Sequence, residues 1–202
     1  MNIPNFITTI RVILSFCVAI LLCFNGNYIA TIAFVLFFIA AISDMLDGYV
    51  ARKYGQITNI GKFMDALSDK IMVIGLLFIM IGLNQFKEWN LFIAFCALIT
   101  VSREFFVSGI RMLAAKENVV LAAEKLGKFK AIFQMVGLGA IVFTYAIETD
   151  FNLQDTVFYT LIFNLGIICL AISTLLAAIS GISYAIKYSY LLKTNDDKRE
   201  IL

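Results

Sequence analysis

The stretch YIATIAFVLFFIAAISDMLDGYV, residues 28–50, begins as an apolar run and ends with two carboxylates three residues apart. An apolar run of about 20 residues is long enough to cross a bilayer as a helix. Charged groups close to the end of such a helix are costly and usually functional. This stretch therefore predicts a helical membrane protein and marks the position of a polar site within it.

The composition of the whole chain agrees with a membrane protein. The chain has 202 residues, of which 61% are hydrophobic and 15% are charged, and its mean hydropathy is +0.92. Soluble domains contain about half apolar and about one quarter charged residues. The single proline fits a chain that is almost all helix.

Six stretches are long and apolar enough to be transmembrane helices. They lie near residues 6–24, 28–50, 62–84, 90–112, 127–148 and 156–186. The breaks between them are short and polar, as helix–helix connections usually are. We therefore expect an all-α integral membrane protein with six transmembrane helices. It would form one domain over residues 1–202, with a short interfacial segment near 1–6 and a charged tail near 190–202.

The distribution of basic residues predicts the orientation. Lys and Arg gather between the second and third spans, between the fourth and fifth, and after the sixth. The loops on the other side contain Lys87 as their only base. By the positive-inside rule, both termini are cytoplasmic. We expect a multi-pass protein of the cell membrane, with its polar site on the cytoplasmic side and with no nucleic-acid partner.

Four aspartates flank the connection between the second and third spans: Asp44, Asp47, Asp65 and Asp69. At about 100° per residue, each pair lies on one face of its helix, within arcs of roughly 140° and 80° that include neighbouring small residues. The small neighbours are Gly48 and Ala51 on the second span and Gly61 on the third, and Arg52 lies within the arc of the second span. Small residues let a flat ligand or a phosphate reach the backbone, although they also allow close helix packing.

Hard metal ions are the expected partners of these carboxylates. Unit charges about 4 Å apart repel by about 4 kcal/mol at an effective dielectric near 20, so four acids need raised pKa values or bound cations. The chain has no His, and its four Cys are scattered through apolar stretches. Oxygen ligands favour Mg²⁺, Mn²⁺ or Ca²⁺ over zinc. We expect two ions, Mg²⁺ or Mn²⁺; the alternative is a salt-bridge cluster with Arg52, Lys62 and Lys70.

The aspartate pattern resembles the signature of the CDP-alcohol phosphotransferase family. The matching positions are Asp44-x-x-Asp47-Gly48-x-x-Ala51-Arg52 and, after eight residues, Gly61-x-x-x-Asp65-x-x-x-Asp69. The resemblance implies six transmembrane helices around a polar cavity that opens to the cytoplasm. It implies metal binding by Asp44, Asp47 and Asp65 with help from Asp69, Asp69 as the base, and a CDP site at Gly48, Ala51, Arg52 and Gly61. One departure is Ala66, where members often carry Pro; alanine keeps the helix regular.

A second polar group predicts the acceptor. Basic residues lie deep in the fourth span and at the start of the fifth: Arg103, Arg111, Lys128 and Lys130. Converging on the aspartates, they would form an anion pocket, and hence bind a phosphorylated alcohol. The alternative is that they signal topology and contact anionic lipid head groups.

Shorter motifs resemble the branch of the family that transfers phosphatidyl from CDP-diacylglycerol to sn-glycerol 3-phosphate and releases CMP. They are Asn2-Ile3-Pro4-Asn5-x-x-Thr8-x-x-Arg11, Arg103-Glu104-Phe105 with Arg111, and Leu126-Gly127-Lys128-x-Lys130. The resemblance places Asn5 and Thr8 beside the nucleotide or the phosphate pocket. Inositol phosphate or serine as acceptor is one alternative. A divalent cation transporter is another, because intramembrane carboxylates also mark ion pathways. Small residues on spans three to five would allow a homodimer.

Overall fold

The computed structural model describes residues 3–24, 26–53, 59–117, 119 and 125–192, without the side chains of 3–5, 7, 44–53, 59–60, 62, 125, 191 and 192. Six α-helices follow one another along the chain: α1 (Ile3–Leu22), α2 (Ile29–Lys53), α3 (Asn59–Gly82), α4 (Asn90–Lys116), α5 (Lys125–Phe151) and α6 (Val157–Lys187). Two short 3₁₀ helices, η1 (Asn84–Trp89) and η2 (Ser189–Leu192), complete the described part, which contains no strand.

Each of the six predicted apolar stretches coincides with one α-helix, so the all-α fold is confirmed. The observed helix ends differ from the predicted ones by a few residues. For example, α4 continues to Lys116, and the polar break before α4 forms η1. Three segments are long and apolar enough to cross a membrane, namely Asn84–Lys116, Leu126–Phe151 and Val157–Lys187. Two shorter apolar segments lie in α1 and α2, at Thr8–Leu22 and Ile29–Ser43. These features are those of a membrane protein.

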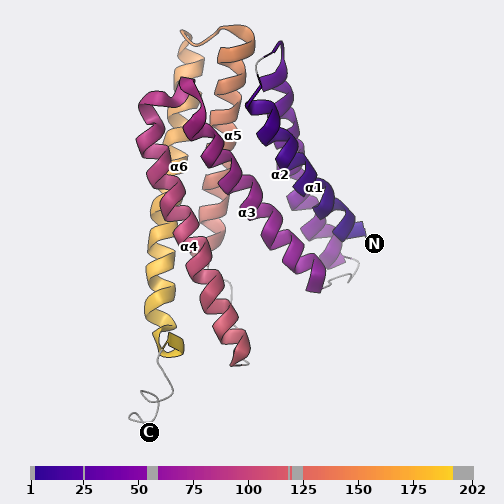
Figure 1. The fold of residues 1–202 in the computed structure, drawn as a ribbon, viewed down its shortest axis with the longest axis vertical. Helices are drawn as coiled ribbons and strands as arrows, with labels where there is room; N and C mark the ends of the chain where they lie inside the picture. Colours follow the sequence, from indigo (N-terminus) through magenta and orange to yellow (C-terminus); the bar gives the residue numbers. More distant parts are fainter. Residues whose placement is uncertain (1–2, 25, 54–58, 118, 120–124, 193–202) are drawn as a thin grey trace.

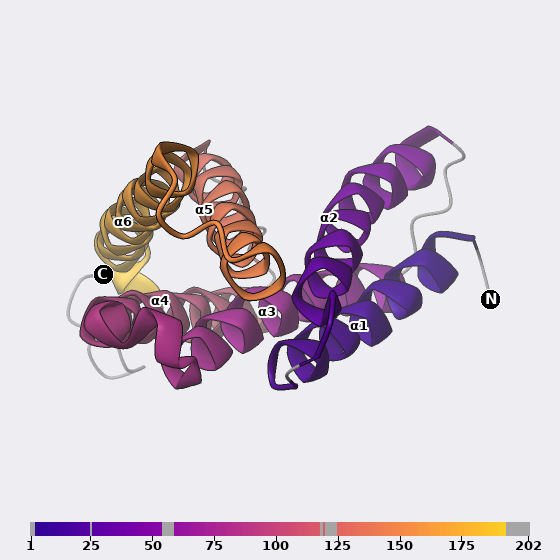
Figure 2. The ribbon, with the colours of Figure 1, turned by 90° about the horizontal axis from the view of Figure 1, so that it is seen from above.

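The helices pack in a closed order that differs from their order in the chain. Contacts join α1 to α2, α2 to α5, α5 to α6, α6 to α4, α4 to α3 and α3 back to α1 (Figures 1 and 2). An additional contact joins α3 to α5 across this ring. Side chains on the inner faces of helices far apart in the sequence can therefore meet.

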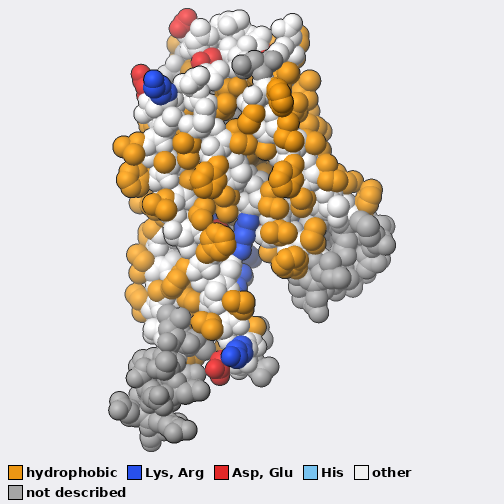
Figure 3. Space-filling model, viewed as in Figure 1, with side chains coloured by type: hydrophobic (Ala, Val, Ile, Leu, Met, Phe, Trp, Pro, Cys, Tyr) orange, Lys and Arg blue, Asp and Glu red, His pale blue; other side chains and the backbone are white. Residues whose placement is uncertain are grey.

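Apolar and polar side chains separate along the long axis of the bundle. The main apolar core includes Leu22, Leu76, Met80, Ile141 and Leu170. It lies toward the end where the α1–α2 and α5–α6 connections are found, at the top of Figure 1. Figure 3 shows Lys and Arg side chains in a hollow that opens toward the opposite end. The fold thus holds its main apolar core toward one end and a basic hollow toward the other.

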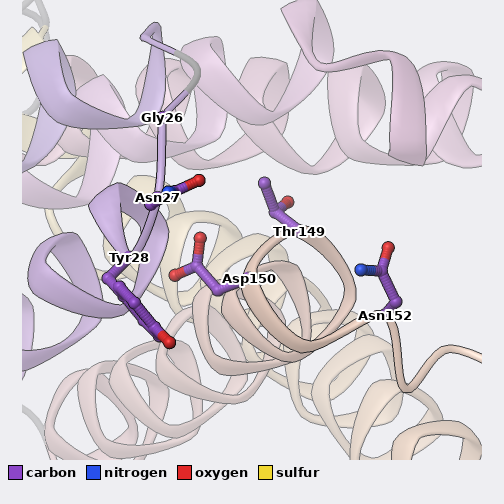
Figure 4. Close-up of a pocket in the computed structure, with 6 residues that line it drawn as sticks. All are labelled: Gly26, Asn27, Tyr28, Thr149, Asp150 and Asn152. Atoms are coloured by element: carbon purple, nitrogen blue, oxygen red, sulfur yellow. The ribbon is translucent and has the colours of Figure 1, made fainter.

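A carboxylate near the end of α5 stabilises the start of α2. Asp150 Oδ2 accepts hydrogen bonds from Thr31 N at 2.7 Å and from Thr31 Oγ1 at 2.6 Å. The first turn of a helix has unsatisfied N–H groups, and a carboxylate there is favourable. Asp150 also lines a polar cavity of about 510 Å³ with Asn27, Tyr28 and Asn152 (Figure 4). This contact gives Asp150, an acidic residue far from the predicted site, a structural role.

Candidate active site

The predicted ligand Asp65 forms an ion pair with a residue of α1. Arg11 Nη2 donates to Asp65 Oδ1 at 2.6 Å. The arginine side chain is 1% exposed, whereas the aspartate side chain is 57% exposed. Asp65 therefore has one oxygen fixed by a buried cation while most of its surface stays accessible. A carboxylate in this position can still ligate a metal ion.

Sequence reasoning did not assign Arg11 a place in the site. The signal that could have found it is a charged residue inside an otherwise apolar run, since such residues are usually functional. Thr8, which was predicted to lie beside the nucleotide or phosphate, is buried one turn before Arg11. Residues three apart share a helix face, so both belong to the side of α1 that meets α3.

Asp69 lies one turn after Asp65 on α3 and is partly buried. Its carboxylate interacts electrostatically with two cations, Lys130 and Arg11, and with two carboxylates, Glu104 and Asp65. Asp69 therefore connects the acidic face of α3 electrostatically with Glu104 of α4 and Lys130 of α5. The next residue, Lys70, donates from Nζ to Ser108 Oγ on α4 at 2.6 Å.

The other signature residues lie on described backbone, but most of their side chains are outside the described set. Gly61 is a partly buried residue of α3. The structure places the remaining positions only as members of helices: Asn5 on α1, and Asp44, Asp47, Gly48, Ala51 and Arg52 on α2. Among the described side chains, no group of three or more His, Cys, Asp or Glu could hold a metal ion. The side chains of two of the four aspartates lie outside that described set, so the metal site stays a prediction. The described pair provides hard oxygen donors one turn apart, which fits Mg²⁺ or Mn²⁺.

The structure brings two of the four predicted acceptor bases together. Glu104 Oε1 accepts from Arg103 Nη1 at 2.9 Å and from Lys130 Nζ at 2.5 Å. Arg103 Nε also donates to Ser180 Oγ on α6 at 3.1 Å. The three charged side chains are 12%, 17% and 8% exposed for Arg103, Glu104 and Lys130, respectively. We call Arg103, Glu104 and Lys130 the basic cluster; it joins α4 to α5 and, through Ser180, to α6.

Glycines on two helices lie against the Arg103 side chain of this cluster. A Cβ atom at Gly127 would lie 3.5 Å from Arg103 Nη2, and one at Gly181 would lie 3.3 Å from Arg103 Cγ. The contact at Gly127 would be an ordinary van der Waals contact, whereas the one at Gly181 would be tight against the aliphatic stem of Arg103. The absence of a side chain at Gly127 leaves space beside Nη2.

The other two basic residues predicted to bind the acceptor, Arg111 and Lys128, lie outside the buried cluster. Arg111 is exposed, and its Cζ lies 5.9 Å from the centroid of the Tyr184 ring on α6, a cation–π contact. Lys128 is exposed as well. Residues two apart on a helix do not face each other, so Lys128 does not share the inward direction of Lys130.

The helical membrane fold, the acidic face of α3 and the buried basic cluster are the features expected of a membrane enzyme that acts on phosphate groups. The family model of CDP-alcohol phosphatidyltransferase matches residues 1–179. The chain belongs to this family, as its aspartate signature predicted, and is therefore a transferase. Family membership argues against the cation transporter that the intramembrane carboxylates also allowed.

Three bacterial relatives carry the same name, CDP-diacylglycerol–glycerol-3-phosphate 3-phosphatidyltransferase. The Bacillus subtilis protein is 32% identical over 162 residues, which cover 80% of this chain and 76% of the relative. The Haemophilus influenzae protein is 38% identical over 149 residues, covering 71% and 77%. The Rickettsia typhi protein is 35% identical over 141 residues, covering 70% and 76%.

Proposed function

We propose that this protein transfers the phosphatidyl group of CDP-diacylglycerol to sn-glycerol 3-phosphate, giving phosphatidylglycerophosphate and CMP. The observation that carries the proposal is the largely buried cluster of Arg103, Glu104 and Lys130, whose Lys130 and Glu104 interact electrostatically with Asp69. An acidic helix face suits the metal-bound diphosphate of the donor, and a buried cation pair suits the phosphate of the acceptor. The names of the relatives support the same substrates.

The donor half of the site is proposed to use the aspartate signature. Asp44, Asp47, Asp65 and Asp69 would hold two Mg²⁺ or Mn²⁺ ions. When bound, such ions neutralise the diphosphate and the departing CMP. The other signature positions would line the CDP group: Asn5, Thr8, Gly48, Ala51, Arg52 and Gly61. Thr8 and Gly61 support this assignment, since they lie on α1 and α3, the two helices that the Arg11–Asp65 pair joins.

The acceptor half would place the hydroxyl group of glycerol 3-phosphate at Asp69. The carboxylate takes the proton of that hydroxyl, whose oxygen attacks the phosphorus linked to the lipid. The bond from this phosphorus to the CMP oxygen breaks, and CMP leaves. Arg103 and Lys130 hold the acceptor's own phosphate group, while the exposed Arg111 and Lys128 attract it toward the hollow.

We propose further that all six helices span the cell membrane in one domain, with both termini and the active site on the cytoplasmic side. The positive-inside distribution of Lys and Arg supports this orientation. The separation of the apolar core from the basic hollow along the bundle supports it as well (Figure 3). The small residues on α3 to α5 would allow a homodimer in the bilayer.

A panel of acceptors tests the proposed function. Purified protein in detergent, with Mg²⁺ and CDP-diacylglycerol, is given glycerol 3-phosphate, glycerol, inositol phosphate or serine, and CMP release is measured. We expect glycerol 3-phosphate to give the highest kcat/KM and free glycerol to be a poor substrate, because the basic cluster needs a phosphate. Faster turnover with inositol phosphate or serine would overturn the assignment of the acceptor.

A further inference from the structure

Glu104 has no part in the reaction described so far, although it is the centre of the basic cluster. A single oxygen, Oε1, accepts from both Arg103 Nη1 and Lys130 Nζ. The two nitrogen atoms therefore cannot be farther apart than the sum of these two hydrogen-bond lengths. A carboxylate of α4 thus fixes the distance between one cation of its own helix and one of α5.

Two cations this close need such a carboxylate between them. Unit charges about 4 Å apart repel by about 4 kcal/mol at an effective dielectric near 20. The three side chains are largely buried, so water screens this repulsion little. Without Glu104, we expect Lys130 to turn away from Arg103 and the pair to separate.

The remaining donors of the pair can serve a ligand while Glu104 stays bound. Arginine has five N–H groups and lysine three. The hydrogen bonds among described residues engage Arg103 through Nε and Nη1, to Ser180 and Glu104. Lys130 Nζ gives its hydrogen bond to Glu104. Arg103 Nη2 faces the position where Gly127 has no side chain. An anion can therefore accept hydrogen bonds from Nη2 and from the lysine ammonium while the carboxylate keeps its own two.

We infer that Glu104 is a positioning residue for the acceptor's phosphate group. It holds Arg103 and Lys130 as a pair, with Arg103 Nη2 and the other N–H groups of Lys130 directed to one phosphate. This inference rests on the proposed function, because it assigns the acceptor phosphate to the basic cluster. Lys130 and Glu104 both interact electrostatically with Asp69, so we expect an acceptor held by the pair to direct its hydroxyl toward the base.

Steady-state kinetics of Glu104→Ala and Glu104→Gln test the inference, with Glu88→Gln as control. Glu88 is an exposed residue of η1, outside the site. We expect Glu104→Ala to raise the KM for glycerol 3-phosphate by about tenfold or more, because a buried charge pair loses its partner. Glu104→Gln keeps the shape and an acceptor oxygen, so its KM should lie between those of Glu104→Ala and the wild type. The KM for CDP-diacylglycerol should change by less than about twofold, since uniform loss of acceptor binding leaves the donor site intact.

A double-mutant cycle and a binding measurement separate positioning from a general structural role. If Glu104 acts through Lys130, the double variant with Glu104→Ala and Lys130→Met should have nearly the same KM for glycerol 3-phosphate as Lys130→Met alone. Inorganic phosphate should raise the melting temperature of the wild type in detergent and have a smaller effect on Glu104→Gln. This second readout needs no turnover.

Several outcomes would overturn the inference. A lower KM for glycerol 3-phosphate in Glu104→Ala would show that the carboxylate only repels the phosphate. Additive effects in the cycle, or a fall in kcat with both KM values unchanged, would also contradict it. If the wild type does not use glycerol 3-phosphate, the proposed function itself fails. If the wild type does use it and the Glu104 variants keep its KM, only the present inference fails.

Discussion

Arg11 on α1 and Asp65 on α3 are joined by an ion pair of 2.6 Å between Nη2 and Oδ1, in which the arginine is almost completely buried and the aspartate is largely exposed. A buried charge is costly without a partner. The pair therefore fixes α1 against α3 and directs one carboxylate of the aspartate signature. It makes the first helix part of the site, and not only a membrane anchor.

Replacing Arg11 by Met tests this role. Methionine keeps much of the apolar stem but removes the charge and the hydrogen bond, so we expect kcat/KM to fall by about tenfold or more. The free energy of unfolding should fall by about 1–2 kcal/mol, less than for a fully buried pair, because the exposed Asp65 can be hydrated. Kinetics and thermal unfolding in detergent measure the two effects. Arg11→Lys should recover part of both, and wild-type behaviour of Arg11→Met would contradict the role.

Replacing Asp69 by Asn tests the assignment of the base. The amide has nearly the same shape but cannot accept the hydroxyl proton, so kcat should fall by about 100-fold to 10,000-fold. Binding of CDP-diacylglycerol, measured by its effect on melting temperature, should remain. Asp155→Asn, a change at an exposed loop residue, is the matched control. Retained turnover in Asp69→Asn would mean that another group takes the proton.

Arg103 and Arg111 should contribute unequally to acceptor binding. Arg103 is held in the buried basic cluster, whereas Arg111 is exposed beside Tyr184. Arg103→Ala should therefore raise the KM for glycerol 3-phosphate by about tenfold to 100-fold, and Arg111→Ala by less. In both variants the KM for CDP-diacylglycerol should change much less. A larger increase in KM for Arg111→Ala than for Arg103→Ala would place the phosphate nearer the C-terminal end of α4.

Removal of divalent cations tests the metal assignment. We expect EDTA to abolish CMP release and added Mg²⁺ or Mn²⁺ to restore it, because the ligands are hard oxygens. Asp65→Asn should raise the Mg²⁺ concentration for half-maximal activity by about tenfold, as expected when one ligand weakens. Undiminished activity in excess EDTA would show that the carboxylates act without metal ions.

Asp150 should matter for stability and not for catalysis. Asp150→Ala removes both hydrogen bonds to Thr31 at the start of α2, and loss of a helix cap costs about 1–2 kcal/mol. The melting temperature in detergent should fall, while KM values stay close to those of the wild type. Asp155→Ala, in the loop that follows α5, serves as control. A loss of turnover in a folded Asp150→Ala protein would point to a role of the polar cavity in function.

The sequence predicts the helices of this fold well because runs of about 20 apolar residues are a strong signal. It predicts their ends less well. The α4 helix continues past the apolar run to Lys116, and residues 84–89 form η1 instead of an open loop. Neither feature has a hydrophobic pattern of its own, since helix ends depend on local hydrogen bonds.

One part of the site, the acidic face of α3, is predictable from the spacing of its residues along the helix. Asp65 and Asp69 fall on one face by helical spacing alone. The Arg11–Asp65 pair and the bridge from Glu104 to Lys130 join helices that are separate in the sequence, α1 with α3 and α4 with α5. Periodicity does not say which helices are neighbours, so these two contacts needed the three-dimensional arrangement.

The most direct test of the account is to identify the lipid made by the reconstituted protein. Liposomes that contain the purified chain and CDP-diacylglycerol are supplied with Mg²⁺ and glycerol 3-phosphate, and lipid products and CMP are quantified by mass spectrometry. We expect phosphatidylglycerophosphate and CMP in equal amounts, with neither formed when glycerol 3-phosphate is omitted or when Asp69 is replaced by Asn. CMP release without the acceptor, or a lipid product that lacks the glycerol phosphate group, would contradict it.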